Sequence, residues 1–528
     1  MKNIIIITVH LLVMGCAVKH PTKPSSQFSN HQLILSQPIT ISTEQAVFHG
    51  SENLLQVPEN RNEPSGRLLA LHFFRFEAKQ KTDLPPVIFL GAGPGEPYDV
   101  VHFSESEYGN RAKSWVWELA FVNQKRDLIL INQRGNPNAP GLPLDSFAFK
   151  YKNGEQDQPF DWNLRNKNRA HALEEYIKSF QETDVDIKGY SILEMVEDIE
   201  SIRKLYNDPK LALIGTSFGS QWALAYMRQY PQNVDRAILS GLEPLDRNHD
   251  KPSDRWRVMT KIADYAAADP SIAPYLPEGG LINAYQTIIE KLEKGPVDVK
   301  LNVPAEDLNE TILIGLDDFR MGYRNPYARG RLESINSWPK YITEIYQGDM
   351  RTLALRSIGR GGNSNSLALS ALVDKSLGGN EEWVNQVNQD PASRWLGPIN
   401  GYLDEFMKIE PNMDVGDEFR QQQKNKIPLI MIQGDMDLNT PIENAYYLQP
   451  FFSQNHLITV KRGTHTAKRA FILSDSELAS DVYQFMNLDF NKTSFKDFKA
   501  TLPDTYELPS FEFWPITGES LFDKYTQE

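Results

Sequence analysis

Short apolar, β-branched runs alternate with helical patterns along much of the chain. Two of these runs, 87–90 and 429–432, are continuously apolar, as expected for strands buried on both faces of a sheet. The predicted strands cover residues 68–76, 86–90, 128–132, 211–215, 237–240, 428–433 and 457–461. The predicted helices cover residues 192–206, 217–229, 442–452 and 477–486. This alternation predicts an α/β fold with a mostly parallel central sheet flanked by helices.

The alternation of strands and helices stops between Glu243 and about Arg420. Amphipathic helical stretches, such as 253–268 and 281–294, take its place. We interpret this region as a large helical cap inserted into the α/β core. The predicted units are 36–243 for the first half of the core, 244–420 for the cap, 421–490 for the second half of the core and 491–528 for a C-terminal tail that wraps the surface.

The N-terminus has the pattern of an export signal. A short positive start precedes an apolar run from Ile4 to Met14, which is too short to span a bilayer and has the shape of a signal peptide. Cys16, the single cysteine of the 528-residue chain, follows this run. The residues before Cys16 resemble a bacterial lipobox, with Met14 in the place of a smaller residue. We therefore expect a lipoprotein signal peptide over residues 1–16, lipidation of Cys16 and a tether over 17–35.

Lipidation implies a protein anchored to a membrane of the bacterial cell envelope. Ala17 stands where an aspartate is associated with retention in the inner membrane, so the expected place is the outer membrane, facing the periplasm or the exterior. An ordinary signal peptide with an incidental cysteine is the alternative.

Charge and residue spacing exclude several classes of function. The net charge of −14 argues against nucleic-acid binding, because no basic surplus is available to neutralise phosphates. No later apolar stretch is long enough for a transmembrane helix. His, Cys and Asp residues show no metal-ligand spacing, so we expect neither a metal nor another cofactor.

Gly215-Thr216-Ser217-Phe218-Gly219 lies between a predicted strand and an apolar-periodic helix. A strand, a sharp turn flanked by glycines and a helix form the context of a nucleophile elbow in the α/β hydrolases. The glycines are needed because the turn is strained and crowded. This pattern predicts Ser217 as the nucleophile.

A serine hydroxyl is a weak nucleophile without a base, and in this fold the chain order is serine, acid, histidine. Of the ten histidines, only His249, His456 and His465 follow Ser217. His249 precedes every strand that could carry the acid. His456 lies at the start of the last predicted strand, at the end far from the nucleophile elbow. His465 follows that strand on a short loop, at the carboxyl edge where the sites of open α/β sheets lie. By elimination, His465 is the predicted base.

The acid is expected directly after the strand that ends at Gln433, in the loop from Gly434 to Pro441. Its carboxylate must accept a hydrogen bond from the imidazole and stabilise the imidazolium. Asp435 and Asp437 both qualify by position. Asp437 lies further into the loop and is the prediction, with Asp435 as a turn-forming residue.

The oxyanion of an acyl-transfer intermediate needs hydrogen-bond donors. Gly91-Ala92-Gly93-Pro94-Gly95 follows the predicted strand 86–90, where this fold presents its oxyanion loop. The candidate donors are the backbone N–H groups of Ala92 or Gly93 together with that of Phe218. A simple Gly/Pro turn is the alternative.

These motifs together resemble the proline iminopeptidase and tripeptidyl aminopeptidase family of α/β hydrolases. Residues 91–95 resemble the family's His-Gly-Gly-Pro-Gly loop, and Asn132-Gln133-Arg134-Gly135 its Asp-Gln-Arg-Gly. Residues 55–61 resemble the Val-Pro-x-(Asp/Glu) entry of the tripeptidyl branch. Residues 434–441 resemble its Gly-x-x-Asp-x-x-Thr-Pro acid loop, which implies Asp437 as the acid. The resemblance is scattered over roughly residues 50 to 470.

The chain departs from the family at several of these positions. Gly91-Ala92 stands for His-Gly, Asn132 for Asp, and Phe218 for the usual Tyr, and threonines replace the glycines on either side of His465. The triad is unaffected by these departures.

The resemblance implies an α/β-hydrolase fold and an exported aminopeptidase that cleaves N-terminal residues from short peptides through an acyl-enzyme. Recognition of a free α-ammonium group needs a carboxylate in or under the cap, and Glu243 is a candidate beside an ordinary loop role. An esterase or lactonase of the same fold would use the same triad. A non-catalytic binding lipoprotein is a third reading, although such a protein has no need of Ser217, Asp437 and His465 in order.

Overall fold

The computed structural model describes residues 32–63, 65–98, 103–104, 106, 109–135, 146–150, 158–301, 311–322, 332–358 and 363–527. The predicted signal peptide over 1–16, Cys16 and all but the last residues of the tether lie outside this set. Residues 33–35, the end of the predicted tether, already belong to the first strand. Among the described residues, no helix has the length and apolar character needed to cross a membrane.

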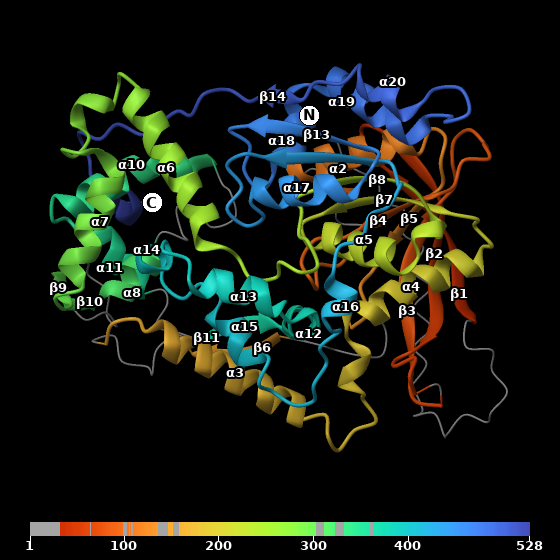
Figure 1. The fold of residues 1–528 in the computed structure, drawn as a ribbon, viewed down its shortest axis with the longest axis horizontal. Helices are drawn as coiled ribbons and strands as arrows, with labels where there is room; N and C mark the ends of the chain where they lie inside the picture. The colour runs from red at the N-terminus through yellow and green to blue at the C-terminus, as the bar shows by residue number, and fades with distance from the viewer. Residues whose placement is uncertain are drawn as a thin grey trace.

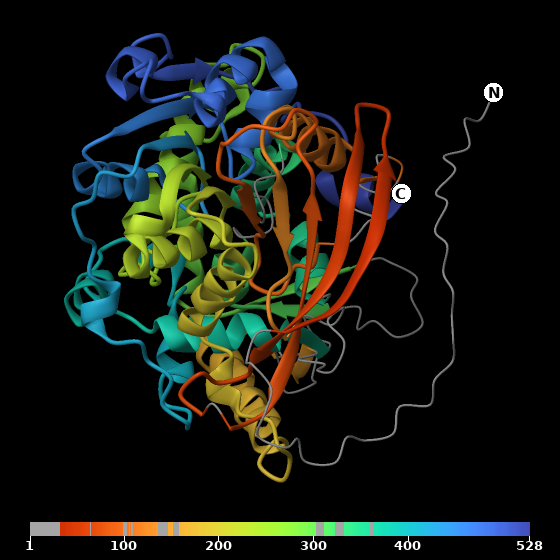
Figure 2. The same cartoon turned by 90° about the vertical axis from the view of Figure 1, so that its right-hand side faces the viewer.

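A ten-stranded sheet forms the core, with the order β1-β2-β3-β5-β4-β7-β8-β12-β13-β14. The strands are β1 (Leu33–Ser42), β2 (Val47–Pro58), β3 (Leu68–Phe76), β4 (Val87–Leu90), β5 (Leu128–Ile131), β7 (Leu211–Thr216), β8 (Val234–Ser240), β12 (Leu429–Gly434), β13 (Asn455–Lys461) and β14 (Thr505–Glu507). From β5 to β14 all neighbours pair in parallel. Strands β1 and β2 add an antiparallel edge and are the two long strands at the side of the sheet in Figure 2.

Helices cover both faces of this sheet. In β4, Ile88 and Leu90 pack in one cluster with residues of α4 and α5, whereas Val87 and Phe89 pack on the opposite face with α2 and α19. Burial on both faces explains why β4 is continuously apolar. These helices are α2 (Asn110–Val122), α4 (Ile192–Leu205), α5 (Phe218–Gln229) and α19 (Ser476–Tyr483). The arrangement confirms the predicted α/β-hydrolase architecture of the central sheet and its flanking helices.

The seven predicted strands all form, with boundaries shifted by at most three residues. The helix predicted over 442–452 is shorter than expected: α17 ends at Leu448, and a 3-10 turn, Gln449–Phe451, follows it. Strands β1 and β2 were not predicted. Most of β1 is exposed, so its apolar positions show no consistent buried face.

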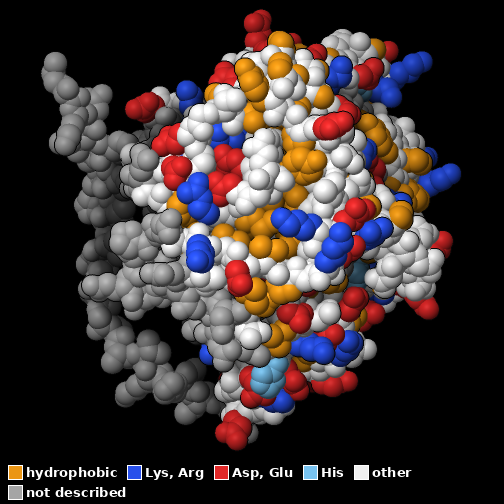
Figure 3. Space-filling view, turned by 90° about the vertical axis from the view of Figure 1, so that its left-hand side faces the viewer, with side chains coloured by type: hydrophobic (Ala, Val, Ile, Leu, Met, Phe, Trp, Pro, Cys, Tyr) orange, Lys and Arg blue, Asp and Glu red, His pale blue; other side chains and the backbone are white. Residues whose placement is uncertain are grey.

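A separate hydrophobic cluster forms the outer part of the cap, at the left of Figure 1. Its helices are α6 (Pro252–Ala268), α7 (Gly280–Leu292), α8 (Leu316–Gly322), α10 (Leu332–Tyr346) and α11 (Arg351–Ile358). A small antiparallel sheet of β9 (Val297–Lys300) and β10 (Thr311–Ile314) accompanies them. On the side of the molecule that Figure 3 shows, acidic and basic side chains are interspersed, and the described residues there form no continuous basic patch.

The cap is built from two insertions, not one. Strand β6 (Ser146–Lys150) pairs with β11 (Asn363–Leu367), and α3 (Trp162–Lys178) packs along α15 (Gly401–Phe406), as the lower part of Figure 1 shows. The predicted boundary at 244 placed β6 and α3 in the first half of the core. Sequence order alone misplaced them because their partners lie about two hundred residues further along the chain.

The C-terminal tail runs from the core to the cap. Strand β14 extends the central sheet beside β13, and Phe511, Leu521 and Phe522 are then buried in the cap cluster. Figure 1 shows this segment crossing from β14 to the cap. The tail therefore joins the two parts of the molecule.

Candidate active site

Ser217 lies in the sharp turn between β7 and α5. Its backbone has φ 58° and ψ −130°, a strained conformation for a residue with a side chain. A Cβ atom at Gly215 would lie 2.3 Å from the carbonyl oxygen of Gly219, and one at Gly219 would lie 2.1 Å from that of Leu90. The two flanking glycines are therefore required by close backbone packing, which leaves the serine at the carboxyl end of the sheet.

The structure brings Ser217, His465 and Asp437 together. His465 Nε2 lies 3.0 Å from Ser217 Oγ, and His465 Nδ1 lies 3.0 Å from Asp437 Oδ2. The three residues follow β7, β13 and β12, whose carboxyl ends meet at one edge of the parallel sheet. Each contact has the length of a hydrogen bond, so the geometry is that of a charge-stabilised serine–histidine–aspartate triad.

Asp437 is held by a dense set of donors. Its Oδ1 accepts the N–H groups of Asn439 and Thr440, at 2.9 and 3.0 Å. Its Oδ2 accepts Thr440 Oγ1 at 2.6 Å and Gln433 Nε2 at 3.1 Å. Burial by itself raises the pKa of Asp437, but the charge of His465 and these hydrogen bonds outweigh it and lower the pKa.

His465 has the complementary shift. Burial lowers its pKa, but the adjacent Asp437 carboxylate outweighs burial, so that the pKa of His465 lies above its usual value. Asp437 therefore stays ionised near neutral pH and stabilises an imidazolium at His465.

The other acid and histidine candidates lie elsewhere. Asp435 forms an ion pair with Lys261 and accepts the backbone N–H of Arg462 at 2.7 Å, away from the imidazole. His456 Nε2 contacts the Pro503 carbonyl oxygen at 3.0 Å, and His249 lies near Asp404. Of the two aspartates that the loop offers, only Asp437 contacts His465.

Residues 91–95 lie directly beside the elbow, since a Cβ at Gly219 would also come within 3.1 Å of the Gly91 carbonyl oxygen. Gly93 and Gly95 have positive φ, 116° and 99°, which a side chain would disfavour. Helix α5 begins at Phe218 without a side-chain cap on its first N–H groups. The loop containing Ala92 and Gly93 and the start of α5 thus flank Ser217 as an oxyanion site requires.

Comparison with known proteins agrees with this geometry. Residues 85–270 match the profile of a family described as alpha/beta hydrolase fold. The order of the strands and the elbow between β7 and α5 are those of that fold. The chain has the α/β-hydrolase fold.

Among curated proteins, the chain is similar to the putative hydrolase YuaR of Escherichia coli, at 22% identity over 52% of this chain and 56% of YuaR. It is also similar to the serine protease Hip1 of Mycobacterium tuberculosis, at 28% identity over 35% of each chain. The chain thus spans about half of YuaR and about a third of Hip1.

Among solved structures, a serine hydrolase from Cycloclasticus zankles matches with a TM-score of 0.31 and 12% identity, over 86% of this chain and all of that one. A bromoperoxidase from Bacillus anthracis matches with a TM-score of 0.35 and 12% identity, over 83% of this chain and all of that one.

Gln133 holds the loop 91–95 beside the nucleophile elbow. Its Oε1 accepts the N–H of Gly95 at 2.6 Å, and its Nε2 donates to the Ala92 carbonyl oxygen at 3.1 Å. Asn132, the neighbouring residue, accepts the N–H of Tyr98 at 2.5 Å. Sequence reasoning used these residues only as a family motif. Their position directly after a buried strand was the available signal that they face the site.

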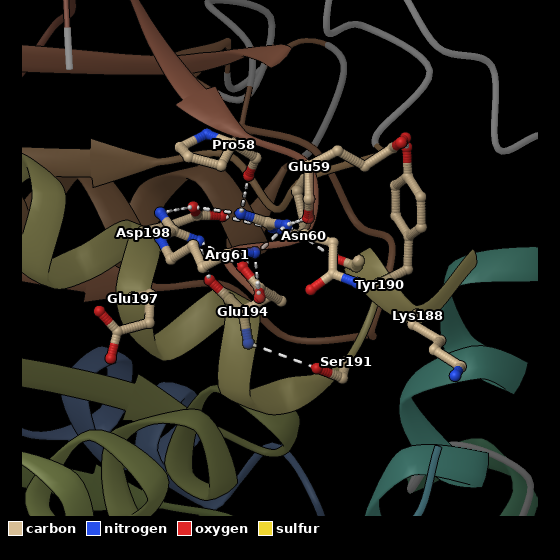
Figure 4. Close-up of polar contacts among 12 residues, drawn as sticks. Pro58, Glu59, Asn60, Arg61, Lys188, Tyr190, Ser191, Glu194, Glu197 and Asp198 are labelled. Atoms are coloured by element: carbon tan, nitrogen blue, oxygen red, sulfur yellow. Dashed lines mark hydrogen bonds and ion pairs between the residues drawn. The ribbon is translucent and has the colours of Figure 1, made fainter. Parts of the chain in front are cut away.

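Arg134 lies in a buried ionic cluster with Asp198. Figure 4 labels other residues of this cluster, among them Arg61, Glu194 and Asp198. Its guanidinium donates to Asp198 at 2.5 and 2.7 Å and to the carbonyl oxygens of Glu59 and Gly189 at 2.5 and 2.6 Å. Arg61 donates to the same Asp198 at 2.8 Å. The cluster therefore joins the 55–61 motif, the end of β5 and helix α4, and supports the segment that carries Gln133.

Glu243, the residue predicted to contact the substrate amine, lies beside the nucleophile. Its Oε1 is 3.5 Å from Ser217 Oγ, and its backbone N–H donates to Ser220 Oγ at 3.0 Å. Burial raises the pKa of Glu243 to about 8. Among the described residues, its carboxylate forms no ion pair.

Thr440 is the contact that the sequence reasoning missed. Its hydroxyl donates to Asp437 and lies 3.2 Å from His465 Nδ1, so it contacts both members of the acid–base pair. The Asp-x-x-Thr spacing within residues 434–441 was the signal, because a threonine three residues on reaches back to the aspartate. Among the described residues, no group of three or more His, Cys, Asp and Glu side chains is arranged to hold a metal ion.

Proposed function

We propose that this hydrolase is a serine aminopeptidase that releases N-terminal residues from short peptides through an acyl-enzyme. The observation that supports the peptide substrate is the position of Glu243: a carboxylate without a cation partner among the described residues, 3.5 Å from the Ser217 hydroxyl. The similarity to a serine protease over part of the chain agrees with a peptide substrate.

In the proposed reaction, Ser217 Oγ attacks the scissile carbonyl carbon while its proton passes to His465 Nε2. The oxyanion accepts hydrogen bonds from the N–H of Phe218 and from that of Ala92 or Gly93. The C–N bond then breaks, and the leaving amine takes the proton from His465. Water, activated by the same histidine, hydrolyses the ester on Ser217 and restores the hydroxyl.

The distance from Glu243 to Ser217 favours release of one residue at a time. In an amino acid, the α-nitrogen lies about 2.5 Å from the carbonyl carbon. A carboxylate that touches the nucleophile can therefore contact the ammonium group of the very residue that is transferred to Ser217. For a released tripeptide, that ammonium would lie about 7 Å further along an extended chain.

The experiment compares two matched substrates, an aminoacyl ester and the same ester with an acetylated amine, on the wild type and on Glu243→Gln. We expect acetylation to remove most activity of the wild type, and Glu243→Gln to lower kcat/KM for the free amine roughly 30- to 100-fold, as for the loss of one charge-assisted contact. Hydrolysis of the acetylated ester should change little.

A wild type that prefers the acetylated ester would instead identify a general esterase. Labelling of Ser217 by a fluorophosphonate separates either enzyme from a non-catalytic binding protein, which would not react.

The lipid anchor at Cys16 is also a proposal. It is supported by the apolar run before Cys16 and by the absence of any other cysteine in the chain. We propose that the hydrolase is held by this anchor at the outer membrane, where short peptides in the cell envelope are its substrates.

A further inference from the structure

Asp435, the aspartate that does not contact His465, has two partners from different parts of the molecule. Its Oδ1 accepts the backbone N–H of Arg462 at 2.7 Å, in the loop that leads to His465. Its Oδ2 pairs with Lys261 Nζ, on helix α6 of the cap. The Asp435 side chain is only 7% exposed. One buried carboxylate therefore bridges the cap and the loop 462–466 that carries His465 (the histidine loop).

The histidine loop is strained at the contact with Asp435. Arg462 has a φ of 59°, one of three positive values among the described non-glycine residues. The neighbouring backbone is hydrogen-bonded to the acid loop (residues 434–441), because the N–H of Met436 donates to the Gly463 carbonyl oxygen at 2.9 Å. A strained residue persists only when its surroundings hold it, and Asp435 supplies one of the hydrogen bonds that do so.

The cap is packed against the same loop. Met436 and Leu438, the residues on either side of Asp437, are buried in the hydrophobic cluster of the cap. Arg257, one turn before Lys261 on α6, donates to the Asp435 carbonyl oxygen at 3.3 Å and pairs with Glu443. Helix α6 therefore contacts both the backbone and the side chain of Asp435.

We propose that Asp435 is a positioning residue that couples the position of cap helix α6 to the orientation of His465. When Lys261 holds Oδ2, Oδ1 is directed at Arg462 N–H, and the loop places the imidazole between Ser217 and Asp437. A displacement of α6 frees the carboxylate and relaxes the loop. The cap thereby sets the reactivity of the triad in addition to enclosing the substrate. This inference rests on the proposed serine hydrolase chemistry.

Lys261→Gln tests the proposal because it removes the cap side of the bridge and leaves every residue of the triad in place. Glu443→Gln is the matched control: it removes a second ion pair between α6 and the core, with the same change of charge magnitude, and leaves both carboxylate oxygens of Asp435 with their partners. The readout is the rate of fluorophosphonate labelling as a function of pH, which needs no knowledge of the natural substrate.

We expect Lys261→Gln to lower the labelling rate roughly tenfold, as for a small misplacement of a catalytic group. The acid limb of the pH profile should move to lower pH, because an imidazole further from Asp437 loses part of the interaction that raises its pKa. Glu443→Gln should show neither effect. Asp435→Asn and the double variant Lys261→Gln/Asp435→Asn should resemble Lys261→Gln, because the same bridge is broken each time.

Equal effects of Lys261→Gln and Glu443→Gln, or an unmoved acid limb in Lys261→Gln, would overturn the inference and make Asp435 a simple structural contact. A wild type that fails to label at all would instead refute the proposed function, so the two failures are distinct. Thermal unfolding of each variant verifies that the compared proteins are folded.

Discussion

Glu243 and His465 are both partly buried beside Ser217, yet their pKa values have different causes. Burial raises the pKa of Glu243 to about 8, although the charge of His465 acts in the opposite direction. For His465, burial lowers the pKa, but the Asp437 carboxylate outweighs burial and raises it. Near neutral pH, a largely protonated Glu243 and a polarised imidazole therefore lie beside the same nucleophile.

The triad residues should differ sharply from Asp435 in their effect on turnover. We expect Ser217→Ala or His465→Ala to lower kcat by about 10⁴-fold or more, since attack and proton transfer act as one unit. Asp437→Asn should lose nearly as much, because the amide cannot stabilise the imidazolium. Asp435→Asn should lose only about tenfold, as for a positioning residue. Steady-state rates on one ester check this, and an Asp435→Asn loss equal to that of Asp437→Asn would reverse the two assignments.

The pH dependence should distinguish amine recognition from ester hydrolysis. Glu243 must be ionised to hold an ammonium, so kcat/KM for an aminoacyl ester should rise as pH rises through about 8. It should fall again as the substrate's α-ammonium loses its proton, also near about 8, which leaves a narrow maximum. The acetylated ester should show only a rise through the raised pKa of His465, followed by a plateau. Superimposable profiles for the two substrates would argue against the role of Glu243.

At the scale of elements, parallel strands bring the reactive loops to one edge, and side chains behind the loops hold them there. Gln133, shortly after β5, forms hydrogen bonds with the loop after β4. Arg134 links the end of β5 to helix α4 through Asp198. The Gln-Arg pair therefore has one member facing the site and one facing the interior. This division explains why both residue types are present in the motif although neither takes part in the triad.

Replacing Arg134 should lower the stability of the fold more than it lowers the catalytic rate. Arg134 and Asp198 are each 1% exposed. Arg134→Met therefore leaves the buried Asp198 carboxylate with Arg61 as its one ion-pair partner among the described residues. We expect a loss of about 3–5 kcal/mol in the free energy of unfolding, the usual effect of breaking one side of a buried pair. Urea denaturation measures it. Lys178→Met, which breaks an exposed pair on α3, is the control and should cause no measurable change. A similarly small effect of Arg134→Met would show that the cluster is dispensable.

At the scale of the whole molecule, packing contacts hold the cap and the core together in addition to the chain segments that run between them. The tail leaves the sheet at β14 and buries Phe511 and Leu521 in the cap cluster. Helix α6 contacts the acid loop, and β6 with α3 supplies the second insertion. Because helix α6 contacts the loop that carries Asp437, we expect the cap and this catalytic loop to respond to substrate together.

Cys16 lies outside the described residues, and its proposed lipidation would decide where the whole protein is located. Replacing Cys16 with Ser should abolish lipidation, so the protein should leave the membrane fraction or accumulate as uncleaved precursor. Stable anchoring needs more than one acyl chain, at about 0.8 kcal/mol per buried methylene. The purified variant should keep its esterase activity. Detergent partitioning and incorporation of radioactive palmitate check this, and a wild type that is soluble and unlabelled would favour ordinary export.

The sequence by itself determined the core strands, the elbow and the histidine. Strands buried on both faces are continuously apolar, and few histidines follow Ser217. The elbow needs Gly215 and Gly219 because a Cβ atom at either position would lie within 2.3 Å of a backbone oxygen. Each of these features depends on neighbours in the chain or on a fixed chain order, and both can be read from one sequence.

Only the tertiary structure decided which side chains meet across the fold. Asp435 and Asp437 are two residues apart on one loop, and the direction of each depends on contacts with Lys261 and His465, far away in the chain. The same holds for Gln133 against the 91–95 loop and for β6 against β11. Such contacts join residues separated by tens to hundreds of positions, so their selection depends on the packing of the whole molecule and leaves no periodic signal in the sequence.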